Sequence, residues 1–211
     1  MPLIFASSLL LGFSGAMMPG PLLTYTLDKS LNTGPRAGFV IITGHALLEI
    51  TLIGLIFLGF DIILQSGPAQ VLIGIVGGLL LVTMGADMIR RSLTNRIRIE
   101  VSGTGAGTRS MMLSGALITA ANPYFLLWWA VIGLGFLVQS YRLFGFAGVL
   151  VFYAGHVLAD IIWYGAISVV VGNTRRFIRE RLYRGIIVAL GGVLIFFGCT
   201  FFYNALQLLM V

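Results

Sequence analysis

Long apolar stretches alternate with short polar segments along the whole chain. The apolar stretches number six and lie near 5–27, 37–60, 69–89, 110–139, 145–171 and 185–209. Each has the roughly 20 residues that a helix needs to cross a bilayer, and each exceeds the ~9–11 residues of a membrane barrel strand. None alternates apolar and polar residues with the period of two that such strands show. The pattern therefore predicts an all-α membrane protein with six transmembrane helices.

The composition supports the same class. Of the 211 residues, 58% are hydrophobic and only 9% are charged, whereas an ordinary soluble domain has roughly 25% charged residues. The chain has too few charges to cover a surface that faces water. Stretch 5–27 also lacks the basic segment that precedes the apolar core of a signal peptide, so we expect it to be a helix of the mature protein.

Positive charges are concentrated in three of the polar segments. With six crossings, segments 28–36, 90–109 and 172–184 lie on one side of the membrane, and they contain twelve of the thirteen Lys and Arg residues. The remaining one, Arg142, lies on the other side. The positive-inside rule then predicts a multi-pass protein of the inner, cytoplasmic membrane, with these three loops cytoplasmic and both termini outside. The net charge of +6 thus indicates topology and contact with membrane lipid, and not nucleic-acid binding.

The chain divides into two similar halves. Segment 99–109 is rich in Gly, Ser and Thr and is typical of a flexible linker, which leaves units 1–98 and 110–211. The motif GHxxx[ED]x4G occurs once in each unit, 111 residues apart, beginning at Gly44 and at Gly155. Because each unit has three helices, an odd number, the second must enter the membrane upside down. Two inverted three-helix repeats are typical of secondary transporters, whose substrate sites lie near the midplane between the repeats.

Proline interrupts the first and the fourth apolar stretch. Proline removes a backbone N–H and clashes with the preceding turn, so we expect both helices to be broken. The half-helix after each break would present free N–H groups and a partial positive charge, which suit a substrate carboxylate. The candidate substrate-binding residues are Pro19, Gly20, Pro21, Asn122 and Pro123.

The second and fifth stretches each carry a histidine one helical turn before a carboxylate. The pairs are His45 with Glu49 and His156 with Asp160. Ionisable groups cost at least about 2.5–3.5 kcal/mol at the centre of a membrane helix, so we interpret them as functional. One hypothesis is a proton relay, because histidine titrates near neutrality and burial favours a protonated acid. A second is a divalent metal site at the repeat interface, because two imidazoles and two carboxylates suit Zn²⁺ or Mn²⁺. The third is a purely structural hydrogen bond in each helix.

Other candidate chemistry is sparse. HALLE has the wrong order for the HExxH zinc motif, and Cys199 has no histidine beside it and no second thiol. We therefore expect no enzyme and no cofactor other than a bound divalent cation. Trp128, Trp129, Trp163 and Tyr164 lie inside the apolar stretches, where they either line a pocket or fill the core. Glycines in the third and sixth stretches permit close helix packing, within one protomer or in a homodimer.

Several of these segments resemble a known family. The Pro-Gly-Pro of the first stretch, the Gly-rich third stretch that ends in Met-Gly-Ala-Asp, and NPYFLLWWAVIG in the fourth look like the LysE/RhtB-type amino-acid exporters. The resemblance spans nearly the whole chain. It implies a small-molecule substrate, namely an amino acid or a related metabolite, and export driven by the proton gradient. The paired histidines depart from the family's pattern, and they keep a divalent-cation transporter as the alternative.

Overall fold

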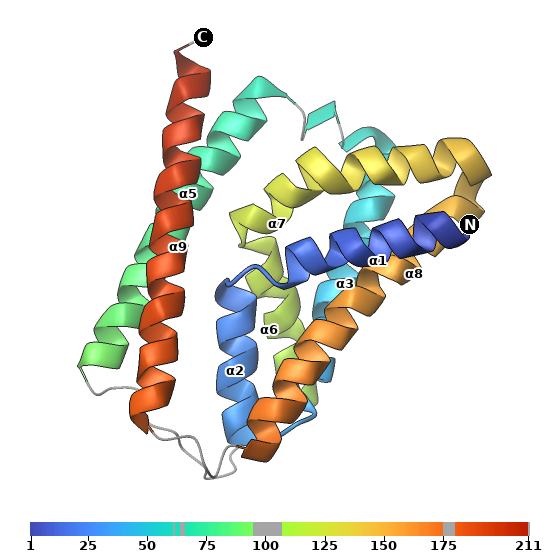
Figure 1. Ribbon diagram of the computed structural model, residues 1–211. Coiled ribbons are helices and arrows are strands. Elements are labelled where there is room, and N and C mark those ends of the chain that lie inside the picture. Colours follow the sequence, from blue (N-terminus) through green and yellow to red (C-terminus); the bar gives the residue numbers. More distant parts are fainter. Residues whose placement is uncertain (61, 64–65, 95–106, 175–179, 211) are drawn as a thin grey trace.

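Figure 1 shows a computed structural model of the chain, which describes residues 1–60, 62–63, 66–94, 107–174 and 180–210. All regular elements within these residues are helices. The predicted linker 99–109 lies mostly outside them, and so does the most basic part of segment 172–184.

The helices follow the predicted apolar stretches closely. In chain order they are α1 (Pro2–Ala16), α2 (Pro21–Thr33), α3 (Ala37–Leu55), the π-helical turn η1 (Ile56–Phe60), α5 (Gly67–Leu93), α6 (Thr108–Ala120), α7 (Pro123–Trp128), the π-helical turn η2 (Trp129–Gly133), α8 (Leu134–Thr174) and α9 (Glu180–Leu209).

The first apolar stretch is broken at its Pro-Gly-Pro sequence. Helix α1 ends at Ala16, and α2 begins at Pro21 with extended Gly20 before it. The axes of α1 and α2 differ by 79°. Proline fits the first position of a helix, since no N–H is needed there, so the same residue that stops one helix starts the next.

The fourth stretch is broken in the same way. Helix α6 ends at Ala120, and Pro123 is the first residue of α7, after extended Asn122. From Pro123 the helical path continues through η2 into α8, where Phe144 and Gly145 leave the helical conformation. Gly145 has φ +59°, a left-handed conformation that glycine adopts without strain. This bend coincides with the predicted gap between the fourth and fifth stretches.

The prediction of a membrane-spanning all-α protein is confirmed, whereas the number of crossings is not. Within the described residues, four helical segments are long and apolar enough to cross a membrane, and there are five if the bent α1–α2 pair is one span. Helix α6 has 13 residues and is therefore only about 20 Å long. The 51-residue segment Tyr124–Thr174 counts as one of the four, although it bends at Gly145.

Close helix packing depends on glycine. Helices α5 and α9 run side by side (Figure 1), and a Cβ on Gly78 would meet the carbonyl oxygen of Gly198 at 2.7 Å, as a Cβ on Gly198 would meet that of Gly78. Helix α1 packs against α8, and α6 packs against α3. In the first of these pairs, a Cβ on Gly12 would lie 2.9 Å from Ala159 Cβ. Small residues let membrane helices approach until their backbones touch.

The helix ends that flank the three positively charged segments lie together. In Figure 1, helices α2, α5 and α8 end at the lower side of the molecule, and α3, α6 and α9 begin there. The described helix ends that flank segments 28–36, 90–109 and 172–184 therefore lie at the same end of the helix bundle.

Candidate functional site

Both helix breaks and both His/carboxylate pairs line one pocket. The predicted site residues around it are Gly20, His45, Glu49, Asn122, His156 and Asp160. The two breaks also lie next to each other, because a Cβ on Gly20 would be 3.8 Å from Asn122 Nδ2. Residues from opposite halves of the chain therefore form a single candidate site.

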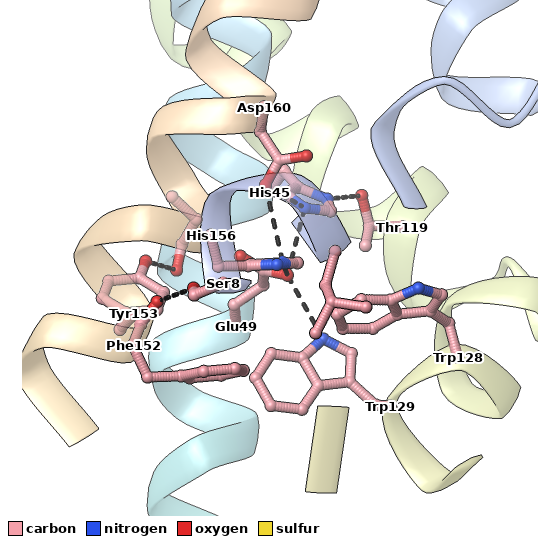
Figure 2. A network of polar contacts seen from close by, with 12 residues as sticks. Ser8, His45, Glu49, Thr119, Trp128, Trp129, Phe152, Tyr153, His156 and Asp160 are labelled. Atoms are coloured by element: carbon pink, nitrogen blue, oxygen red, sulfur yellow. Dashed lines mark hydrogen bonds and ion pairs between the residues drawn. The ribbon is translucent and has the colours of Figure 1, made fainter. Parts of the chain in front are cut away.

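The two pairs meet across the interface between α3 and α8 (Figure 2). His156 Nε2 lies 2.8 Å from Glu49 Oε1, which is closer than Glu49's own helix neighbour, His45 Nε2, at 3.3 Å. Both imidazole Nε2 atoms lie 3.6 Å from Asp160 Oδ2. All four side chains are at most 10% exposed, so the four groups form one buried cluster and not two separate pairs. We call these four residues the pocket cluster.

Aromatic side chains line one side of the pocket cluster. Trp129 Nε1–H donates to Glu49 Oε1 at 3.2 Å. The His156 ring stacks on Phe152 with an interplanar angle of 8° and lies 4.9 Å from the ring of Trp128. Trp129 belongs to the π-helical turn η2, a local widening that is frequent at functional sites. Aromatic faces attract cations, so this wall suits a positively charged His156 ring.

The hydrogen bonds around His45 restrict where its protons lie. The Thr119 hydroxyl donates to the Gly115 carbonyl at 2.8 Å, and His45 Nδ1 is 3.0 Å from the same hydroxyl oxygen. When that hydroxyl donates to Gly115, its oxygen accepts from His45 Nδ1–H. His45 Nε2, which faces both carboxylates, then either carries a second proton or accepts one from a protonated acid. The pocket cluster therefore shares at least one proton.

Several polar atoms of the pocket cluster retain bonding capacity. Among the described residues, no hydrogen-bond partner is within reach of Glu49 Oε2, His156 Nδ1 or Asp160 Oδ2, and all three atoms are fully buried. Most buried polar atoms in proteins are paired. The polar atoms of the pocket cluster are therefore incompletely satisfied within the described protein.

The two helix breaks differ in how their backbone groups are satisfied. Asn122 Oδ1 accepts from Tyr124 N–H at 3.1 Å, so the side chain caps α7. No side chain caps α2, whose first hydrogen bond within the helix runs from Thr24 N–H to the Gly20 carbonyl. Because Pro21 has no N–H, the open donors of α2 are those of Leu22 and Leu23. Of the two ends, that of α2 has the unused donors.

Other predicted residues lie near the pocket without lining it. Pro21 is buried at the start of α2, and Pro19 is partly buried in the preceding break. The side chain of Pro123 lies outside the described set, although its backbone begins α7. The prolines therefore shape the pocket through the backbone conformation of their neighbours.

Sequence reasoning missed Thr119 and Tyr153. Thr119 contacts His45 from α6, and Tyr153 donates its hydroxyl hydrogen to the Ala46 carbonyl at 2.8 Å. Each occurs one helical turn before a predicted element, since Thr119 precedes Pro123 and Tyr153 precedes His156. A polar residue one helical turn before a predicted site residue was the signal that could have identified both.

The geometry also bears on the metal hypothesis. His45, Glu49 and Asp160 offer ligand atoms that all lie within 4.8 Å of one another. However, Glu49 Oε1 already accepts from Trp129, whose indole nitrogen is only a donor. A donor N–H on the oxygen nearest both imidazoles suits protons better than a metal cation.

Comparison with known proteins gives one family. Residues 13–205 match the family model of the LysE type translocator. A protein named putative amino acid efflux protein YcgF, from Bacillus subtilis (strain 168), is 22% identical over 207 residues, which are 98% of this chain and 99% of that protein. The chemotactic transduction protein ChpE of Pseudomonas aeruginosa is 25% identical over 175 residues, covering 82% of this chain and 84% of ChpE. No solved structure gives a significant match.

Proposed function

Since this chain belongs to the LysE type translocator family, we propose that it is a proton-coupled secondary transporter that exports amino acids or related small metabolites across the cytoplasmic membrane. The family is one of transporters, and a relative that aligns over its whole length is named for amino acid efflux. The observation that carries the proposal is the single pocket in which four buried ionisable side chains meet both helix breaks.

The substrate carboxylate would bind at the start of α2. The Leu22 and Leu23 N–H groups there have no side-chain cap, and the partial positive charge of a helix N-terminus stabilises an anion. Asn122 adds the Nδ2 amide, which lies beside Gly20, while its Oδ1 is used by Tyr124. The Asn122–Pro123 break thus contributes an amide donor and sets the direction in which α7 leaves the pocket.

Charge balance favours an exchange of protons for substrate. Two carboxylates and two imidazolium groups make a cluster with no net charge, which is the state that a low-dielectric site tolerates best. Loss of one proton leaves one negative charge, and the ammonium group of an amino acid would neutralise it. A proton and an ammonium group are therefore alternative occupants of the same cluster.

Symmetric contacts support an inverted repeat. Helix α1 packs against α8 of the other half, as α6 packs against α3, and Gly78 faces Gly198 as Gly191 faces Gly85. In the six-crossing arrangement, α6 and the helix after Pro123 together form the fourth crossing, which is bent. The helix after Gly145 forms the fifth crossing. The positive-inside rule orients the lower end of Figure 1 toward the cytoplasm, and both repeats would tilt about the pocket to alternate its access.

Transport by the purified protein in liposomes tests this proposal. Vesicles would be loaded with single radiolabelled amino acids, and the release of each would be followed with and without an imposed pH gradient. We expect at least one amino acid to leave faster than from protein-free vesicles loaded in the same way, and to move against its own gradient only when a pH gradient is present. Zn²⁺ and Mn²⁺ would be assayed in parallel with metal-sensitive dyes. Transport of these ions without any amino-acid movement would contradict the proposal and restore the metal hypothesis.

A further inference from the structure

The two carboxylates of the pocket cluster occupy matching positions in the repeats but have different surroundings. Glu49 Oε1 has three nitrogen atoms within 3.3 Å, from His156, Trp129 and His45. Asp160 Oδ2 has the two imidazole Nε2 atoms at 3.6 Å and, within the part of the chain that the structure describes, no hydrogen bond. Sequence symmetry predicts equal roles for the two acids, whereas their contacts are unequal.

We infer that Asp160 is the exchanging carboxylate, which binds either a proton or the ammonium group of the substrate, and that Glu49 is a fixed counter-charge that positions the two histidines. This assignment rests on the proposed function, because it concerns how the same pocket binds an amino acid. It gives the two acids separate tasks that the transport proposal leaves undivided.

Hydrogen bonding explains why the roles divide in this way. Hydrogen bonds to charged groups contribute more than neutral ones, and a buried group that loses its partners bears the desolvation cost. Movement of Glu49 would leave Trp129 N–H and His156 Nε2 without their acceptor, and neutralisation of Glu49 would weaken both hydrogen bonds. Asp160 Oδ2 has no short bond to break, so it can take up a new partner at little cost.

The surroundings of Asp160 allow no other permanent partner within the pocket. The ionisable groups that face it are His45 and Glu49 from α3, and His156 and Tyr164 from its own helix. Among the residues that the structure describes, the pocket lining includes no Lys or Arg. Asp160 shares the pocket with Gly20 and Leu22 at the start of α2. A zwitterion would therefore place its carboxylate at α2 and its ammonium group at Asp160.

A pair of matched variants tests the assignment in the liposome assay. Asp160→Asn and Glu49→Gln each replace one acid by its neutral isostere. The control Asp28→Asn makes the same change in α2 at a residue that does not line the pocket and that pairs with Lys29. The probes are an amino acid that the wild type transports, the 2-hydroxy acid with the same side chain, and the corresponding amine without a carboxylate. Each unlabelled analogue competes against the radiolabelled amino acid, and thermal unfolding of each purified variant serves as a folding control.

For Asp160→Asn we expect the unfolding temperature of the wild type. Its affinity for the amino acid should be about 10- to 100-fold weaker, and it should bind the amino acid no more tightly than the 2-hydroxy acid. Uphill movement driven by the pH gradient should disappear. For Glu49→Gln we expect a lower unfolding temperature and slower transport, with the preference for the amino acid and uphill movement both retained. Asp28→Asn should behave as wild type.

Two results would overturn the assignment. One is an equal loss of ammonium preference in both acid variants, and the other is its loss in Glu49→Gln alone. If Asp160→Asn does not fold, proton release by Glu49→Gln is measured instead. Binding of the amino acid to this variant should release a proton into unbuffered solution, and binding of the 2-hydroxy acid should not. Absence of that release would also overturn the assignment. Failure of the wild type to transport any amino acid would instead refute the proposed function itself.

Discussion

Two buried polar clusters in this protein differ in how fully their hydrogen bonds are satisfied. The serine cluster consists of Ser30, Pro35, Gly38 and Ser168, where α2, α3 and α8 meet. Ser168 Oγ accepts from Gly38 N–H at 2.8 Å and donates to the Pro35 carbonyl at 3.0 Å, and Ser30 Oγ lies 2.9 Å away. The pocket cluster, in contrast, leaves oxygen atoms of Glu49 and Asp160 unpaired.

This difference separates a structural contact between helices from the candidate binding site. Every hydroxyl of the serine cluster has a neutral partner within the protein, so the cluster holds three helix segments together and has no capacity left for a ligand. The pocket cluster contains ionisable groups, faces empty space and has capacity to spare. Changes in the serine cluster should affect stability, and changes in the pocket cluster should affect transport.

The largest effect is expected at a glycine of the serine cluster. In Gly38→Ala, the new Cβ would lie 2.6 Å from Ser168 Cβ and even closer to the Tyr164 carbonyl oxygen. Helices α3 and α8 would have to separate, at a cost of about 3 kcal/mol or more. Size-exclusion chromatography of detergent extracts should show little monodisperse protein. Gly54→Ala in the same helix is the control, because no atom lies within 4 Å of its Cβ position, and equal behaviour of the two variants would contradict the packing argument.

The next largest effect concerns the proton-carrying capacity of the pocket cluster. His156→Gln keeps a hydrogen-bond donor beside Glu49 but cannot hold a positive charge. Breaking a buried charged pair costs about 3 kcal/mol of stability. Because the pocket cluster also loses one site that can hold a proton, uphill transport should fall by more than about tenfold, while the protein still folds. Liposome transport at several pH values measures this, and a variant that transports uphill at the wild-type rate would show that His156 is structural.

Ser168→Ala should lower stability and leave transport intact. The change leaves the Gly38 N–H and the Pro35 carbonyl without their partner, at a cost of about 1–3 kcal/mol. Thermal unfolding of the purified protein should shift down by several degrees. Thr43→Ala removes an exposed hydroxyl that bonds to the Phe39 carbonyl in its own helix and should shift it much less. A large loss of transport per folded molecule in Ser168→Ala would assign the serine cluster a role in transport.

The smallest effect is expected for a single donor to Glu49. Trp129→Phe keeps the aromatic ring and removes the N–H that bonds to Glu49 Oε1, which is worth about 1.5–3 kcal/mol for a charged acceptor. Two nitrogen donors remain on that oxygen, so we expect transport to fall by about tenfold at most. Trp128→Phe is the matched control, because Trp128 donates to Ser14 and not to the pocket cluster. Equal effects of the two variants would point to ring packing as the cause.

Much of the fold was predictable because its determinants are local in sequence. Runs of apolar residues predict helices in a bilayer, and Pro21 and Pro123 start new helices where their missing N–H requires it. Positive charge predicts the grouping of the loops. The number of crossings was less predictable, since the path through Gly145 depends on how α8 packs and not on hydropathy alone.

The sequence by itself determined which ionisable residues this protein carries into the membrane and that they occur in two related halves. Only the tertiary structure decided how they are partnered, because hydrogen bonds between helices depend on the rotation and depth of each helix. It placed His156 closer to Glu49 than His45 is and brought Trp129 onto the same oxygen through a π-helical turn. It left Asp160 Oδ2 without a hydrogen bond to any described residue. The symmetry of the motif is a property of the chain, and the asymmetry of the site is a property of the packing.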